Sequence, residues 1–200
     1  SATPAAKACQ SSAVVSQPLL KRTTRSVSSS ATPIAFRTWL GASLPLAQAL
    51  RLSRTSFYWF FKDREELLEA LLSRWREQNT GSLIKQCGLY AETIIEAVLN
   101  VTDCWLDSEL FDSSFEFAVR SWALQSPDVL AEVQDADQQR MEALRQVFLR
   151  FGETEARADV RARTMYLVQI GYISMQTQED LRVRMKRIPD YVEIFTGQPP

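Results

Sequence analysis

Residues 52–68 read LSRTSFYWFFKDREELL and predict two short, capped helices joined by an aromatic hinge. Ser53 suits an N-cap, because its hydroxyl can accept from the free N–H groups of the first helical turn. Asp63 and Glu66 have the spacing of a capping box, with aspartate in place of the usual serine or threonine, and they predict the start of the second helix. An apolar stripe at helical spacing then predicts its buried face: Leu67, Leu68, Leu71, Leu72 and Trp75.

The segment upstream completes a helix-turn-helix pattern. We expect a short helix over residues 44–50, a tight turn at 51–52 and a second helix over 54–60. Phe57 and Phe61 lie four residues apart, so they share one face of that second helix and predict its core side. An ordinary hairpin of two helices in a bundle is the alternative interpretation.

The outward face of the second helix is suited to a DNA groove. An exposed helix N-terminus favours an anion, and short polar side chains with an arginine can reach phosphates and base edges. We predict that Arg54, Ser56 and Trp59 read bases. We predict that Thr55, Tyr58 and Lys62 contact the DNA backbone. The complete set of predicted DNA-binding residues is Ser53, Arg54, Thr55, Ser56, Tyr58, Trp59 and Lys62.

The stretch resembles the recognition helix and following helix of the TetR family of one-component transcriptional regulators. The matching positions are Leu52, Ser53, Tyr58, Phe61, Lys62, Arg64, Glu65, Leu67 and Leu68. Two positions depart from the family pattern: Arg51 stands at the turn glycine, and Phe60 stands at the histidine. The resemblance implies a ligand-responsive repressor that binds a palindromic operator as a homodimer and releases it when a small-molecule effector binds.

Charge is divided along the chain in a way that favours the same interpretation. Residues 1–79 carry 11 basic and 5 acidic side chains, a balance of +6, whereas residues 80–200 carry 12 and 19, a balance of −7. A cationic front suits DNA, and an anionic rear domain is repelled by it. A basic disordered tail without a specific role is the alternative.

Residues 1–43 are rich in serine, alanine and threonine, and they show no clear helical periodicity. We expect this segment to be disordered or to hold a divergent first helix. Because it bears arginines and no acidic residue, a transit peptide is a rival explanation.

The remainder of the chain predicts an all-α rear domain. Apolar periodicity indicates helices over residues 92–107, 107–126, 127–151, 155–178 and 179–195, the last bent or broken at Pro189. Ser126 and Pro127 suit the N-cap and first position of one helix, and Gly152 suits its end.

The helix predicted over residues 155–178 indicates a dimer interface. At residues 165–168 it is apolar on nearly all of its faces, and such a helix must be covered on every side. We expect helices near 128–151 and 157–178 to pair two protomers, since two-fold symmetry matches a palindromic operator. The alternative is that this helix is the centre of a monomer core.

Composition argues against most enzyme classes. The chain has no histidine, three widely spaced cysteines and six glycines. It therefore lacks histidine-based catalytic pairs, the usual zinc motifs and a glycine-rich phosphate loop. We expect no enzyme activity, no metal site and no cofactor. No apolar run is long enough to span a membrane, so we expect a cytoplasmic protein.

The aromatic and methionine side chains gather in residues 105–175. Family resemblance implies a small-molecule pocket there, while core packing explains the same residues without a ligand. The candidate ligand-binding residues are Trp105, Phe115, Arg120, Trp122, Tyr166 and Gln169.

The sequence thus predicts an undefined segment at 1–43, a helix-turn-helix domain with its connecting helix at 44–79, and a larger ligand-binding and dimerisation domain at 80–200. The predicted function is a DNA-binding regulator of TetR type. Two alternatives stay open: a helical interaction or ligand-binding protein that has lost DNA binding, and a helical bundle, ligand-binding or enzymatic, with a cleaved leader.

Overall fold

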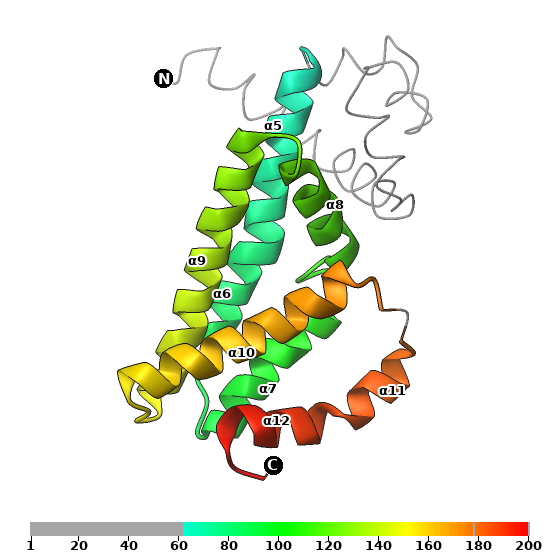
Figure 1. Cartoon of the computed structure of the whole chain (residues 1–200). Helices are drawn as coiled ribbons and strands as arrows, with labels where there is room; N and C mark the ends of the chain where they lie inside the picture. Colours follow the sequence, from blue (N-terminus) through cyan, green and yellow to red (C-terminus); the bar gives the residue numbers. More distant parts are fainter. Residues whose placement is uncertain (1–61, 178, 200) are drawn as a thin grey trace, which may run out of the picture.

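The structure is a computed structural model that describes residues 62–177 and 179–199, and in this part of the chain the regular secondary structure is all helical (Figure 1). The predicted DNA-binding residues from Ser53 to Trp59 lie outside the described residues, as does the whole of 1–43. The helices in chain order are α5 (Arg64–Trp75), η1 (Arg76–Gly81), α6 (Ser82–Cys87), α7 (Ile94–Leu106), α8 (Ser113–Ala123), α9 (Pro127–Arg150), α10 (Glu155–Ser174), α11 (Leu181–Lys186) and α12 (Ile188–Thr196).

The start of α5 confirms the predicted capping box. The backbone N–H of Glu66 donates to Asp63 Oδ1 at 2.9 Å, and the backbone N–H of Lys62 donates to the Glu66 carboxylate at 2.5 Å. The two hydrogen bonds of a capping box are therefore both present. Lys62 itself is exposed beside this helix start.

The helix that begins at Arg64 continues to Cys87, well beyond the segment that the apolar stripe predicted. It widens into the π-helical segment η1 and then resumes as α6. The neighbouring residues Asn79 and Thr80 of η1 are both buried. The domain boundary expected between residues 79 and 80 thus falls within an unbroken helical run.

Local capping explains most of the other helix ends. Ser126 accepts from Val129 N–H with Pro127 at the first position of α9, and Gly152 follows that helix with φ +86°, as predicted. The helix expected from Asp107 begins instead at Ser113, because Asp112 Oδ1 accepts from the N–H groups of Ser114 and Phe115.

The last predicted helix is two helices. The break falls at Arg187, just before the predicted position, and Pro189 lies in the first turn of α12. A proline has no N–H to donate, so the first turn is where a helix tolerates it. No residue of α11 is buried, whereas Val192, Phe195 and Thr196 of α12 are buried.

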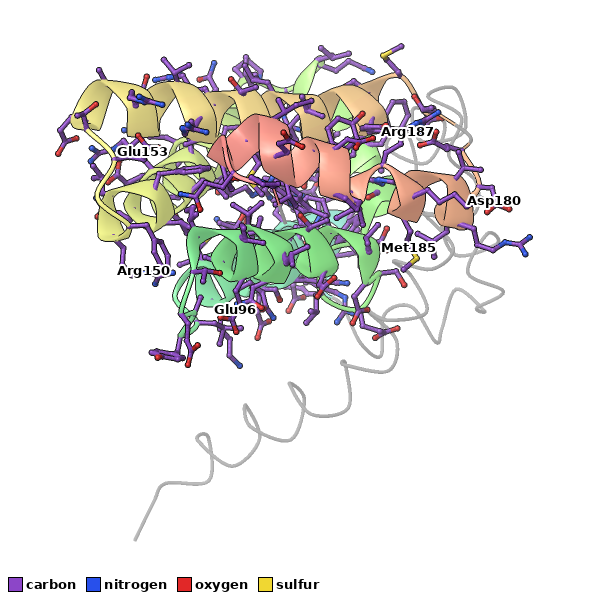
Figure 2. All side chains as sticks on the ribbon, turned by 90° about the horizontal axis from the view of Figure 1, so that it is seen from below. Glu96, Arg150, Glu153, Asp180, Met185 and Arg187 are labelled. Carbon is purple, nitrogen blue, oxygen red and sulfur yellow. The ribbon has the colours of Figure 1, made fainter. Side chains whose placement is uncertain are left out.

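Two apolar clusters form the core. One is built mainly on α7, α9, α10 and α12, and the other on α5, α8 and α9. Seen from below, α12 lies between α10 and α7 (Figure 2) and closes the first cluster. No helix of the described residues is long and apolar enough to cross a membrane.

Candidate functional site

A carboxylate with no solvent exposure lies between the two apolar clusters. Glu116 of α8 accepts hydrogen bonds from four side chains, two of them guanidinium groups. Arg140 donates to it at 2.8 and 3.2 Å, and Arg120 Nε donates at 2.9 Å. Trp75 Nε1 donates at 2.7 Å and Asn79 Nδ2 at 2.9 Å. One side chain thus connects α5, η1, α8 and α9.

A second acidic group balances the charge of this network. Asp137 of α9 forms an ion pair with Arg120 and accepts from the Tyr166 hydroxyl at 2.6 Å. The same hydroxyl oxygen accepts from Arg120 at 3.1 Å and from Arg140 at 3.2 Å. Two guanidiniums therefore face two carboxylates, and α10 joins the network through Tyr166. We call Trp75, Asn79, Glu116, Arg120, Asp137, Arg140 and Tyr166 the Glu116 network.

The π-helical segment brings its polar residues into contact with this network. Asn79 accepts from the Asp112 backbone N–H at 3.0 Å and donates to the Asp112 carbonyl at 3.1 Å. Thr80 Oγ1, on the next residue, accepts from Arg140 Nε at 2.9 Å. Consecutive residues of a regular α-helix point about 100° apart, and the wider turn of a π-helix lets both face the core.

The network is electrostatically strong because water does not reach its centre. Burial alone would raise the pKa of Glu116, but the charges of Arg140 and Arg120 lower that pKa to about 2. Burial alone would lower the pKa of Arg140, but its interactions with Glu116 and Tyr166 outweigh burial and raise that pKa above its ordinary value. Burial also raises the pKa of the Tyr166 hydroxyl, so this group stays protonated and donates to Asp137.

Arg140 also packs between aromatic rings. Its Cζ lies 5.0 Å from the centroid of the Trp75 ring and 5.5 Å from that of Phe111. Cation–π contacts of this kind add to the ion pairs when the cation is desolvated. The network therefore has the properties of a rigid connection between helices. It presents no reactive group, since its carboxylates and guanidiniums are engaged with one another.

The predicted ligand-binding residues fall into separate environments. Arg120 and Tyr166 join the Glu116 network. Phe115 and Trp122 are buried in the apolar cluster on α5, α8 and α9, and Trp105 is buried in the other cluster. Gln169 is buried on α10 and accepts from Arg184 of α11. The structure therefore brings together two of the six residues in a polar site.

Two of these buried residues have a donor for which the described part of the chain supplies no acceptor. Trp105 Nε1 and Gln169 Nε2 are both inaccessible and have no hydrogen-bond partner there. An unsatisfied buried donor costs about 1–3 kcal/mol, so each one needs a physical explanation.

Sequence reasoning missed the central residues Glu116 and Arg140, although a signal for Arg140 is present. The apolar stripe of α9 runs through Val133, Ala136, Leu144 and Val147, and Arg140 occupies the inward position between Ala136 and Leu144. A single arginine in an apolar stripe indicates a buried partner of opposite charge.

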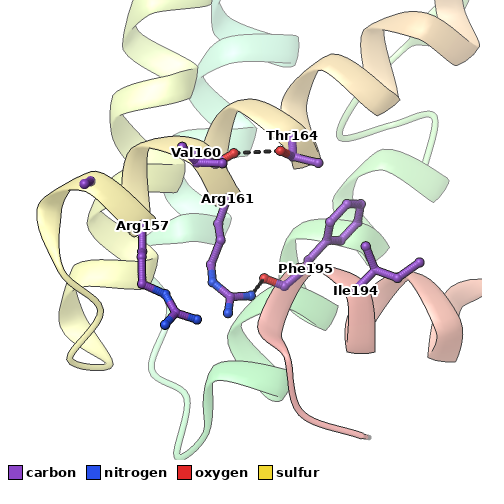
Figure 3. Close-up of a pocket in the computed structure, with 7 residues that line it drawn as sticks. Arg157, Val160, Arg161, Thr164, Ile194 and Phe195 are labelled. Carbon is purple, nitrogen blue, oxygen red and sulfur yellow. Dashed lines mark hydrogen bonds between the residues drawn. The ribbon is translucent and has the colours of Figure 1, made fainter.

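The described surface also carries a groove of about 510 Å³ between α10 and α12 (Figure 3). Val160, Ile194 and Phe195 form apolar walls, and Arg157 and Arg161 stand at one end. Both arginines pair with Glu153, and Arg161 also donates to the Phe195 carbonyl.

Within the described ranges, no group of three or more histidine, cysteine, aspartate or glutamate side chains has an arrangement that could hold a metal ion. Cys87 and Cys104 are free and buried, and burial raises the pKa of each thiol to about 12. These thiols are therefore protonated and unreactive at neutral pH.

Comparison with known proteins adds no assignment. No protein-family model, no curated protein and no solved structure matches this chain.

Proposed function

We propose that this protein is a ligand-responsive, DNA-binding transcriptional regulator of TetR type, acting as a repressor. The supporting observation is the sequence of residues 52–68 together with the capped helix that follows it. That pattern calls for a helix beginning directly after the recognition segment, and α5 begins at Arg64 behind its capping box. Exposed Lys62, at the N-terminal end of α5, is suited to a phosphate contact.

The Glu116 network supports a response to a ligand. Trp75 and Asn79 anchor the long helix that leads from the DNA-binding segment to α8, α9 and α10. A change in the packing of those helices would therefore shift the position of α5. Allostery requires an element whose position depends on both the ligand site and the DNA site, and the helix that carries Trp75 and Asn79 is suited to this role.

Exposed apolar side chains support a homodimer, with α10 as one contributing element. Val160 and Leu167 of α10 are exposed, as are Met175, which caps its C-terminus, and Ile194 of α12 on the rim of the groove in Figure 3. The residues that α9 exposes are mostly polar, although the sequence pointed to 128–151 as a second pairing helix. We therefore propose that α10 and α12 form the protomer contact.

DNA binding is tested by fluorescence anisotropy on the DNA upstream of the protein's own gene and on a scrambled duplex, at two salt concentrations. We expect tighter binding to the upstream DNA and a steep loss of affinity with salt. Arg54→Ala should weaken the specific duplex by about 1–3 kcal/mol, while Lys62→Ala should weaken both duplexes alike.

Lys85→Ala is the matched control for Lys62→Ala. Both lysines are exposed, but Lys85 lies in α6, near the far end of the same helical run. Its replacement should leave DNA affinity unchanged. Absence of any salt-dependent binding by the full chain would favour the alternative, a helical interaction protein that has lost DNA binding.

A further inference from the structure

The amide of Gln169 is buried, and neither of its N–H donors is used among the described residues. Its side chain is 2% exposed, and Oε1 accepts from Arg184 Nη2 of α11. Nε2 carries two N–H donors and has no hydrogen-bond partner within residues 62–177 and 179–199. A group that binds next to Gln169 Nε2 must therefore be a hydrogen-bond acceptor.

Arg184 is a cation without a carboxylate. Its guanidinium lies over the Tyr172 ring, with Cζ 4.6 Å from the centroid, and it takes part in none of the ion pairs among the described residues. Two neighbouring arginines are different: Arg182 pairs with Asp180, and Arg187 pairs with Glu179. Burial lowers the pKa of Arg184, as desolvation does when no anion compensates.

We propose that Gln169 and Arg184 form a binding site for the carboxylate of a small-molecule ligand. One carboxylate oxygen would accept from the free N–H groups of Arg184, and the other would accept from Gln169 Nε2. A guanidinium has five N–H donors, so Arg184 keeps its bond to Gln169 Oε1 in this arrangement. One uncompensated positive charge fits a monoanion.

The surroundings define the rest of the ligand and its route of entry. Ile173 is buried and Ile170 is partly buried on the same helix as Gln169, so the ligand is expected to carry an apolar portion next to its carboxylate. Helix α11 has no fully buried residue, and Arg184 is only partly buried. The helix can move outward at little cost, since few buried contacts oppose local opening.

This inference rests on the proposed function only in naming the chemical class of its effector. The site is tested on the full chain without DNA, so failure of DNA binding leaves the result of this test unchanged. Isothermal titration calorimetry compares hexanoate and benzoate with their neutral amides, hexanamide and benzamide, and with inorganic phosphate. We expect the carboxylates to bind and the amides to bind at least about tenfold more weakly, because charge-assisted hydrogen bonds are lost.

Three variants locate the binding. Arg184→Gln removes the cation, and Gln169→Glu supplies a carboxylate from the protein itself, so each should weaken carboxylate binding about 10- to 100-fold. The Gln169→Glu variant gives Arg184 a partner and keeps the test valid if Arg184→Gln fails to fold. Arg182→Gln is the matched control, because Arg182 lies on the same helix with its side chain 89% exposed. It should bind as the unaltered chain does.

The proposal is overturned by any of four results. These are no carboxylate binding, equal binding of the amides, equal weakening by Arg182→Gln, and tighter binding of phosphate than of either carboxylate. The last result would identify a general oxyanion site in place of a carboxylate site.

Discussion

At the scale of single residues, Glu116 joins four helical segments through one carboxylate. Its carboxylate is fully buried and is the acceptor shared by Trp75, Asn79, Arg120 and Arg140. Removal of one partner from a buried ion pair is far more costly than loss of a surface pair, because the remaining charge stays desolvated.

We predict that Glu116→Gln lowers the free energy of unfolding by about 3–5 kcal/mol, because Arg140 is left buried beside a neutral amide. Chemical denaturation followed by circular dichroism measures this change. The control is Arg163→Gln, which breaks the exposed i,i+4 pair with Asp159 and should cost no more than about 0.5 kcal/mol. Similar losses in the two variants would contradict this account of the network.

Glu116 also predicts how stability depends on pH. Its pKa is lowered from the ordinary 4.5 to about 2 in the folded protein, so the unfolded chain takes up its proton first as the pH falls. The contribution is complete above about pH 4.5 and is lost towards pH 2, and it amounts to about 3 kcal/mol. Denaturation at pH 7, 4.5 and 3 should show this fall, and it should be much smaller in Glu116→Gln.

At the scale of helices, two glycines in contrasting backbone conformations provide a matched pair. Gly152 follows α9 with φ +86°, whereas Gly171 lies within α10. A Cβ at either position meets no atom within 4 Å, so any difference in stability comes from the backbone alone.

Gly152→Ala should destabilise the protein by about 1–2 kcal/mol, because an L-residue is strained at positive φ. Gly171→Ala should stabilise it by about 0.5–1 kcal/mol, because alanine has the higher helix propensity. Thermal and denaturant unfolding of the two variants measure both changes. Equal effects on stability would contradict the assigned end of α9.

Helix ends were predictable from sequence where local chemistry determines them. Asp63, Ser126 and Gly152 act on the backbone within a few residues, so their roles follow from spacing. The π-helical segment was not predictable, because the inward positions of Asn79 and Thr80 depend on partners far along the chain, Glu116 and Arg140.

At the scale of the whole molecule, the candidate site was likewise only partly predictable from sequence, because its contacts join residues far apart in the chain. The sequence predicts Arg120 as a polar group and Tyr166 as an aromatic residue of one site, and the two are in contact. Glu116 was overlooked because it stands between Phe115 and Phe117, where a single carboxylate resembles the polar face of a helix. Its burial depends on α5 and α9, which both pack against α8.

The proposed dimer is a property of the whole molecule, and it predicts unequal effects on two helices. Leu167→Glu on α10 should convert the protein to monomers, because it introduces charge into the proposed contact. Leu130→Glu on α9 is the control, since Leu130 is also exposed but lies outside that contact. Multi-angle light scattering measures both. Dissociation by the α9 variant alone would assign the interface to residues 128–151.

The unbroken helical run from Arg64 to Cys87 has a mechanical consequence. About 22 Å of helix separates Asn79 from Arg64. If the hydrogen bonds of Asn79 act as a pivot, a tilt of about 10° there moves the Arg64 end by about 4 Å, a large fraction of the 5.4 Å pitch of a helix. A small displacement at Asn79 would therefore become, at the N-terminal end of α5, large enough to break the phosphate contact proposed for Lys62.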